Sequence, residues 1–188
     1  MAHDPDDHTP RVVDKPHNRD PLPGALTQAQ FENRIATGVV AAVEHGEGLA
    51  LLLIDLDHFR AFEVQYGRAA ADAVLVTIHE CIADALAATD DLVRFGYDDF
   101  AVLCTKPMNN YGPSLAQRLR ARVSGSAVEI PGAGDAYFFT ASIGVSSFPT
   151  SGAATAADLV AAAASALRRA KQTGRDRVCL AESASASR

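Results

Sequence analysis

Few cysteines, a shortage of basic residues and no long hydrophobic run characterise this sequence, and each of these deficits argues against a class of protein. The 188 residues include three cysteines without metal-ligand spacing, which argues against a zinc site. Cys104 and Cys179 lie in apolar, strand-like runs, which predicts buried free thiols in a reducing cytoplasm. With 17 Lys and Arg against 23 Asp and Glu residues, the formal net charge is -6. Nucleic-acid-binding domains need a basic stripe to neutralise phosphates, so this charge argues against general nucleic-acid binding.

The hydrophobic pattern also argues against membrane association and secretion. No apolar run approaches the ~18 residues that span a bilayer. The amino-terminal segment MAHDPDDHTP is acidic and lacks the apolar core of a signal peptide. We therefore expect a cytoplasmic protein without membrane contact.

Length and composition predict one globular domain with short tails. At 188 residues, with 48% hydrophobic and 21% charged residues, the chain can bury a core of its own. Residues 1–19 have little to bury, which predicts a disordered tail. The predicted domain occupies residues 20–182, and residues 183–188 are expected to form a flexible tail.

Hydrophobic periodicity predicts the first helix and the first strand. From Thr27, apolar residues recur every four positions, which predicts a helix that ends near Gly46. The residues expected on its buried face are Phe31, Ile35, Val39 and Val43. The continuous apolar run 49–54 predicts a strand buried on both faces, with Asp55 and Asp57 at its carboxyl end.

The remaining patterns complete an α+β fold, in which helices flank a mixed β-sheet with a central β-hairpin. Two apolar runs, 92–95 and 100–104, flank a Gly- and Asp-containing turn and predict the hairpin. Its turn would bring Asp98 beside Asp55. Helices are also expected over 59–86 with a break near Gly67, over 114–123 and over 156–171, and strands over 136–147 and 178–180.

Asp55 and Asp98 are candidates for a divalent-metal site. Two-metal phosphoryl transfer requires carboxylates on adjacent strand ends, since the ions clamp a triphosphate and activate the attacking hydroxyl. Mg²⁺ prefers one or two carboxylates plus phosphate oxygens and waters. The same residues have structural uses, because Asp often caps a helix and Asp98-Asp99 is ordinary turn chemistry. Spacing alone leaves both interpretations open.

Six segments, in order, resemble the motifs of GGDEF domains in the diguanylate cyclase family. They are Asp20-Pro21-Leu22-Pro23-Gly24 (DPLTGL), Asp55-Leu56-Asp57-His58-Phe59-Arg60 (D-x-D-x-F-K), Gly67 with Asp72 (GH-x-x-GD), Arg94-Phe95-Gly96-Tyr97-Asp98-Asp99-Phe100 (R-Y-G-G-D-E-F), Ala141-Ser142-Ile143-Gly144-Val145 (S-I-G-V) and Ala170-Lys171-Gln172-Thr173-Gly174-Arg175 (AK-x-x-GR). The resemblance implies a palm-like fold of nucleotidyl cyclase type. It also implies the reaction that converts two GTP into cyclic di-GMP and two pyrophosphates.

The resemblance further implies a role for each matching residue. The implied ligands of Mg²⁺ (or Mn²⁺) are Asp55, the backbone carbonyl of Leu56, and Asp98. The implied catalytic residues are Asp98 and Asp99. The implied substrate-binding residues are Glu63, Asp72, Tyr97, Lys171 and Arg175. Two of these residues also have structural interpretations. Lys171 is a cation that suits the last turn of a helix, and Asp72 is a polar residue that suits an exposed helical position.

Three of these residues depart from the family pattern. Tyr97 replaces a glycine that leaves room for substrate and tolerates a positive φ, so we expect the phenol to crowd the base or ribose, or to stack on one. Asp99 is one methylene shorter than the family's glutamate, so its carboxylate is expected to fall short. Glu63 replaces an asparagine that helps to read guanine.

Two functions are consistent with this pattern. The first is a weakly active or degenerate diguanylate cyclase that binds GTP and a divalent ion and acts as a homodimer in bacterial second-messenger signalling. The second is a catalytically inactive GGDEF module that acts through nucleotide-dependent or purely structural contacts with a sensor or effector protein. The retained residues Asp55, Asp98, Lys171 and Arg175 favour nucleotide binding, and the three departures argue against efficient catalysis.

Overall fold

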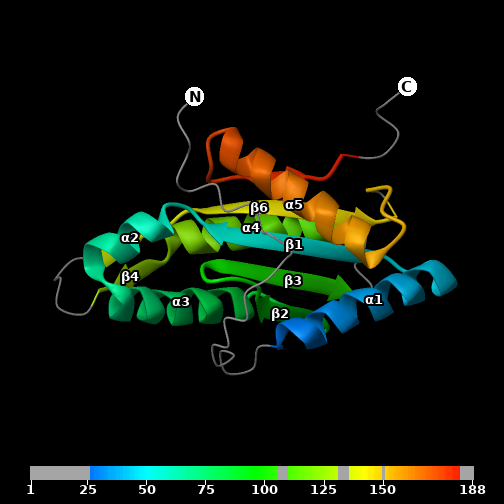
Figure 1. The fold of residues 1–188 in the computed structure, drawn as a ribbon, viewed down its shortest axis with the longest axis horizontal. Helices are drawn as coiled ribbons and strands as arrows, with labels where there is room; N and C mark the ends of the chain where they lie inside the picture. The colour runs from blue at the N-terminus through cyan, green and yellow to red at the C-terminus, as the bar shows by residue number, and fades with distance from the viewer. Residues whose placement is uncertain (1–25, 106–109, 131–135, 150, 183–188) are drawn as a thin grey trace.

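A five-stranded mixed sheet in the order β2-β3-β1-β6-β7 forms the centre of the molecule. The structure, a computed structural model, describes residues 26–105, 110–130, 136–149 and 151–182 (Figure 1). Its elements are α1 (Gln28–His45), β1 (Leu49–Leu56), α2 (Phe59–Tyr66), α3 (Arg68–Ala83), β2 (Asp90–Arg94), β3 (Asp99–Thr105), α4 (Tyr111–Gly125), β4 (Ala127–Glu129), β5 (Ala136–Phe138), β6 (Ala141–Phe148), α5 (Ala156–Gln172) and β7 (Val178–Leu180). β1 pairs antiparallel with β3 and β6, whereas β7 pairs parallel with β6. The predicted α+β class is confirmed.

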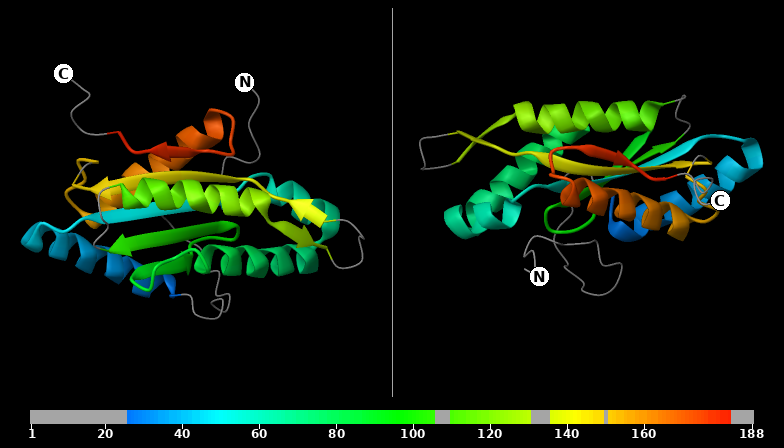
Figure 2. Two further views of the ribbon diagram at one scale, coloured as in Figure 1. Left: turned by 180° about the vertical axis from the view of Figure 1, so that it is seen from behind. Right: turned by 90° about the horizontal axis from the view of Figure 1, so that it is seen from above.

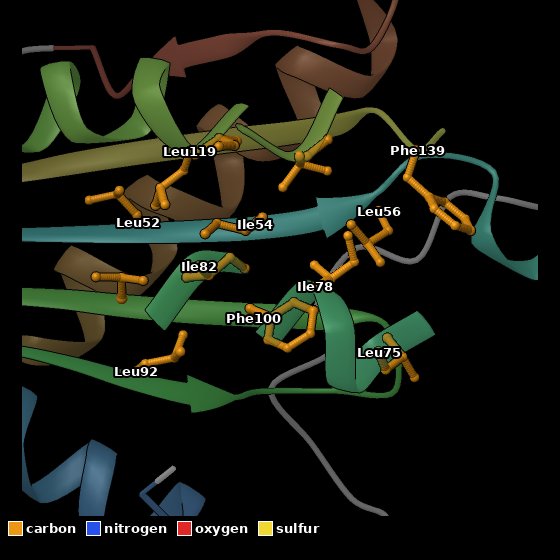
Figure 3. Close-up of a cluster of buried hydrophobic side chains, with 14 of the residues drawn as sticks. Leu52, Ile54, Leu56, Leu75, Ile78, Ile82, Leu92, Phe100, Leu119 and Phe139 are labelled. Carbon is orange, nitrogen blue, oxygen red and sulfur yellow. The ribbon is translucent and has the colours of Figure 1, made fainter. Parts of the chain in front are cut away.

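β1 is the central strand and is buried along its whole length. Because successive strand residues face opposite sides of a sheet, β1 contributes to two separate cores. Leu52, Ile54 and Leu56 belong to the core that includes α3 and α4 (Figure 3). Leu51 and Leu53 belong to the core on the other face, which includes α1 and α5. Figure 2 shows α4 and α5 on opposite sides of the sheet. The predicted strand, buried on both faces, is therefore confirmed.

α1 begins at the predicted residue but buries a slightly different face. The Thr27 hydroxyl accepts a hydrogen bond from the Gln30 amide, and the Gln30 side chain accepts one from the Thr27 amide, which completes a capping box. Val43, expected in the core, is 63% exposed, and Ala42 is buried in its place. Successive four-residue steps drift around a helix of 3.6 residues per turn, so the last contact shifts to a three-residue step.

Within the described residues, no helix has both the length and the apolar character needed to cross a bilayer.

The hairpin forms as predicted, but at one side of the sheet. β2 is an edge strand, β3 lies between it and β1, and β1 occupies the centre that was expected for the hairpin. Position in the sheet also decides the burial of the cysteines. Cys104 on β3 is fully buried as predicted, whereas Cys179 is only half-buried because β7 is the opposite edge strand.

The strand expected over 136–147 is divided into two strands. β5 ends at Phe138, and β6 begins at Ala141. β5 pairs with β4, a three-residue strand that the sequence pattern did not predict, because so short a segment shows no clear alternation. At the division, the Thr140 carbonyl accepts a hydrogen bond from the Asp57 amide at 2.9 Å, which ties this corner to the end of β1.

Candidate metal and nucleotide site

Three carboxylates from neighbouring strands form the centre of the candidate site. Asp55 lies opposite Asp99 in the antiparallel register of β1 and β3, and Asp98 lies in the turn just before β3. One carboxylate oxygen from each residue lies within 4.8 Å of the other two. The predicted juxtaposition of Asp55 and Asp98 is present, and Asp99 reaches the same point despite its shorter side chain. Such oxygens are the ligands that Mg²⁺ and Mn²⁺ prefer, so the residues fit the divalent ions implied by the sequence.

Backbone hydrogen bonds hold the turn that carries these carboxylates. The amides of Phe95 and Gly96 donate to the Asp99 carbonyl at 2.9 and 3.3 Å. A β-carbon on Gly96 would lie 2.6 Å from Asp99 Oδ2, so this glycine makes room for the carboxylate. Tyr97 does not adopt a positive φ. The backbone penalty expected at Tyr97 is therefore absent.

A small cleft opens beside the carboxylates. Its lining residues are Asp55, Leu56, His58, Phe59, Arg60, Asp98, Lys171 and Arg175. Lys171 Nζ donates to Asp55 Oδ2 at 2.6 Å, and both side chains are largely buried. The implied metal ligands and the implied phosphate-binding cations therefore share one cleft. His58, Phe59 and Arg60 also line it, because α2 begins directly after β1; the motif match included them without indicating a role.

The surroundings of Asp99 alter its pKa. Its Oδ1 atom is buried and has no hydrogen-bond partner among the described residues. Burial, together with the nearby Asp55 and Asp98 carboxylates, raises the pKa of Asp99 well above the ordinary aspartate value, and Lys171 only partly opposes this. Asp99 therefore keeps its proton where an ordinary aspartate has lost it. A divalent cation among these oxygens would favour the ionised form.

Tyr97 packs against α2. Its hydroxyl donates to Glu63 Oε1, and its ring meets the Phe59 ring edge-on at a centroid distance of 5.8 Å. Arg94 Nε donates to the Tyr97 carbonyl at 2.9 Å, which anchors the residue from the strand side. Tyr97 and Glu63 do not line the cleft. Tyr97 and Glu63, two of the three departures from the family pattern, are thus joined by a hydrogen bond that sequence spacing did not predict.

Asp72 lies apart from the carboxylate cluster. It is in the first turns of α3, its side chain is 51% exposed, and its Oδ2 lies 3.8 Å from Arg68 Nε. The structure does not place it in the cleft. Both interpretations of this residue, a contact for the base and an exposed helical carboxylate, therefore remain predictions.

Asp57 is a structural residue beside the site. Its carboxylate accepts hydrogen bonds from the Thr140 hydroxyl at 2.6 Å, the Ser142 hydroxyl at 2.7 Å and the Asp176 amide at 3.0 Å. These donors come from the start of β6 and from the loop after α5. One buried carboxylate thus joins three segments around the cleft, and no local pattern could have identified those partners.

The fold and the acidic turn together define a GGDEF-type domain. The family model described as "Diguanylate cyclase, GGDEF domain" matches residues 17–177, and the chain belongs to this family. It is 35% identical over 157 residues to an uncharacterized signaling protein of Caulobacter vibrioides, covering 83% of this chain and 19% of that protein. It is 32% identical over 159 residues to the diguanylate cyclase DgcP of Pseudomonas aeruginosa, covering 85% of this chain and 23% of DgcP.

A solved structure has the same fold over most of this chain. The GGDEF domain of PA1120 (YfiN or TpbB) from Pseudomonas aeruginosa superposes with a TM-score of 0.80 at 32% identity, covering 86% of this chain and 99% of that one. The predicted family and palm-like fold are therefore confirmed. The chain spans about a fifth of the length of the two curated relatives described above.

Proposed function

We propose that this domain binds GTP with Mg²⁺ or Mn²⁺ in the cleft and is a weakly active or degenerate diguanylate cyclase of cyclic di-GMP signalling. The observation that carries this proposal is the shared cleft, in which Asp55 and Asp98 lie with Lys171 and Arg175. Anionic oxygens to hold cations and cations to hold phosphates are both needed to bind a metal–triphosphate complex.

Each residue has a chemical task in this proposal. Asp55, the Leu56 carbonyl and Asp98 hold the divalent ions, which when bound neutralise the triphosphate and make the attacking hydroxyl more acidic. Lys171 and Arg175 bind the phosphates. Asp98 and Asp99 orient the reacting end of the nucleotide. Lys171 pairs with Asp55 at 2.6 Å. When a metal ion and a triphosphate bind, Asp55 would contact the metal ion and Lys171 would contact a phosphate in place of this ion pair.

The hydrogen bond between Tyr97 and Glu63 supports the weak or degenerate form of the proposal. Glu63 is implied to contact the base, and its Oε1 already accepts the Tyr97 hydroxyl. A nucleotide that approached Glu63 would have to break this bond and move the ring from its contact with Phe59. We therefore expect GTP to bind chiefly through its phosphates and the metal.

Calorimetric titration of the purified protein with GTP and Mn²⁺ tests the proposal. Asp98→Asn should weaken binding at least about tenfold, because it removes a charge that faces the metal. Asp84→Asn is the matched control, since Asp84 is 75% exposed and lies 4.0 Å from Arg122, and it should leave the affinity unchanged. Product analysis after incubation with GTP then measures cyclic di-GMP synthesis. A wild type that does not bind at about 1 mM GTP, the upper end of ordinary substrate affinities, would refute the proposal.

The second candidate is a catalytically inactive module that works by protein contact. The curated relatives are several times longer than this chain, which supports an arrangement in which a GGDEF domain works with other domains or proteins. Contact with a sensor or effector protein belongs to this second candidate, whereas the homodimer belongs to the cyclase. GTP binding without dinucleotide product from a dimeric sample would favour this candidate.

A further inference from the structure

The loop after α5 has an unusual backbone conformation next to the phosphate-binding cations. Arg175 and Asp176 both adopt left-handed backbone conformations, with φ of 57° and 41°. Side chains other than glycine rarely adopt this region, and it persists only where surrounding contacts hold it. Because Arg175 lines the cleft, the conformation of this pair sets the direction in which its side chain leaves the backbone.

Contacts from several segments hold the pair in place, among them Arg177 Nε, which donates to the Arg175 carbonyl at 2.8 Å. The Arg175 amide donates to the Ala170 carbonyl at 3.0 Å, and the Asp176 amide donates to Asp57 Oδ2 at 3.0 Å. A further contact comes from α4, where Arg120 Nη1 lies 2.7 Å from Asp176 Oδ1. Arg120 and Asp176 are 29% and 42% exposed, so this ion pair is partly sheltered from solvent. Among the described residues, Arg120 is the partner of the Asp176 side chain.

We propose that Arg120 is a positioning residue for nucleotide binding, acting through Asp176 to hold the left-handed pair that presents Arg175 to the phosphates. The inference rests on the proposed function and adds a residue that does not line the cleft. An exposed ion pair normally contributes little to stability. Here its expected effect is on the geometry of one loop, so phosphate affinity should change while global stability does not.

Arg120→Gln tests this inference, with Arg122→Gln as the matched control from the same helix. Arg122 lies 4.0 Å from Asp84 on an exposed surface and has no described contact with the loop. Calorimetry with GTP and Mn²⁺ should show at least about fivefold weaker binding for Arg120→Gln and wild-type affinity for the control. Titration with Mn²⁺ alone and the unfolding midpoint should not change. An affinity within about twofold of wild type, which is the error of such a comparison, overturns the inference.

A second variant separates positioning from simple loss of charge. Glycine adopts left-handed conformations readily, so Asp176→Gly should make the loop independent of Arg120. In that background Arg120→Gln should have no further effect on GTP affinity. An undiminished effect would mean that Arg120 acts by another route and would contradict the inference.

Amide hydrogen exchange distinguishes failure of this inference from failure of the proposed function. Arg120→Gln should speed exchange of the Asp176 amide, which is bonded to Asp57, and Arg122→Gln should not. If wild type binds no GTP, the proposed function fails and the phosphate role of Arg120 fails with it. The exchange rates still decide whether Arg120 orders the loop, and unchanged rates refute that ordering.

Discussion

At the scale of single residues, the protonation of buried groups has the clearest consequences. His79 on α3 is 6% exposed, its ring centroid lies 6.4 Å from that of Phe100, and its Nε2 has no hydrogen-bond partner among the described residues. Burial lowers the pKa of this imidazole; Glu80 partly opposes the shift, and Arg94 adds to it. The folded protein therefore binds the His79 proton less readily than the unfolded chain does.

This shift predicts a loss of stability in acid. Above about pH 6.5, the ordinary histidine pKa, neither state is protonated at His79 and stability is undiminished. As the pH falls below that value, the unfolded state takes up the proton first, so the free energy of unfolding decreases until the folded pKa is passed. His79→Leu should therefore lose less stability than wild type between pH 7.5 and 5.5 in urea titrations. His45→Gln, at the exposed end of α1, is the control and should behave as wild type. Equal losses in all three proteins would show that other groups cause the acid sensitivity.

At the scale of elements, the contact between β6 and α5 leaves no room for a side chain at Gly144. A β-carbon there would overlap the Ala163 carbonyl and the Leu167 amide, and would lie 2.8 Å from Leu167 Cα. All of these are helix backbone atoms, so the whole of α5 would have to move. Since α5 also carries Lys171, this packing supports the candidate site.

Gly144→Ala should therefore lower the free energy of unfolding by ~2 kcal/mol or more, because overpacking against backbone is not relieved by a change of rotamer. Gly125→Ala is the matched control, since nothing lies within 4 Å of its β-carbon position, and it should change stability by less than about 0.5 kcal/mol. Urea unfolding measures the free energy of unfolding of both variants, and the slope of that free energy against urea concentration should not change. A Gly144→Ala protein as stable as wild type would mean that α5 can move away without cost.

The elements also show which parts of the structure local sequence can predict. The strand at 49–54 was predictable from its continuous apolar run, and the helix beginning after Thr27 from apolar residues at a spacing of four. The proximity of Asp55 to Asp98 followed from the predicted hairpin beside the strand that carries Asp55. The contacts of Asp57 and Arg120 could not be predicted, because their partners lie 83 and 56 residues away and become neighbours only through sheet order.

The direction of the Tyr97 side chain also could not be predicted from the sequence. Tyr97 was expected to crowd the substrate, and its position in the turn was correct. Whether its ring would point into the cleft or toward α2 depends on Phe59 and Glu63, which offer it an aromatic edge and a carboxylate acceptor. In the proposed function, the expected effect of Tyr97 stays at the base and is exerted through its hydrogen bond with Glu63.

At the scale of the whole molecule, the central question is what the family fold can do with an altered site. Membership in the family establishes the scaffold, whereas function depends on the residues placed on it. The proposed cyclase reaction joins two GTP molecules held by two protomers, so the expected activity would depend on assembly as well as on the cleft. A test of catalysis must therefore control both.

The last prediction is that the three departures, rather than the fold, limit catalysis. Tyr97→Gly frees Glu63 and opens space beside Phe59, Glu63→Asn restores the family's base contact, and Asp99→Glu restores the longer carboxylate. In-line transfer is sensitive to displacements near ~1 Å, so these changes together should raise cyclic di-GMP synthesis at least about tenfold, equivalent to ~1.4 kcal/mol of transition-state stabilisation. The effects need not add, because all three residues act on one bound nucleotide.

An appended coiled coil should force dimerisation in both the wild type and the triple variant, so that a missing partner protomer is not mistaken for a defective site. The fused variant with Asp98→Asn added is the control for contaminating activity and should be inactive, because it lacks an implied metal ligand. Product formation from GTP and Mn²⁺ is then compared by chromatography. If the fused wild type turns over GTP as fast as the triple variant, the hydrogen bond between Tyr97 and Glu63 opens without cost during the reaction, and the GYDDF turn is a fully working form of the family signature.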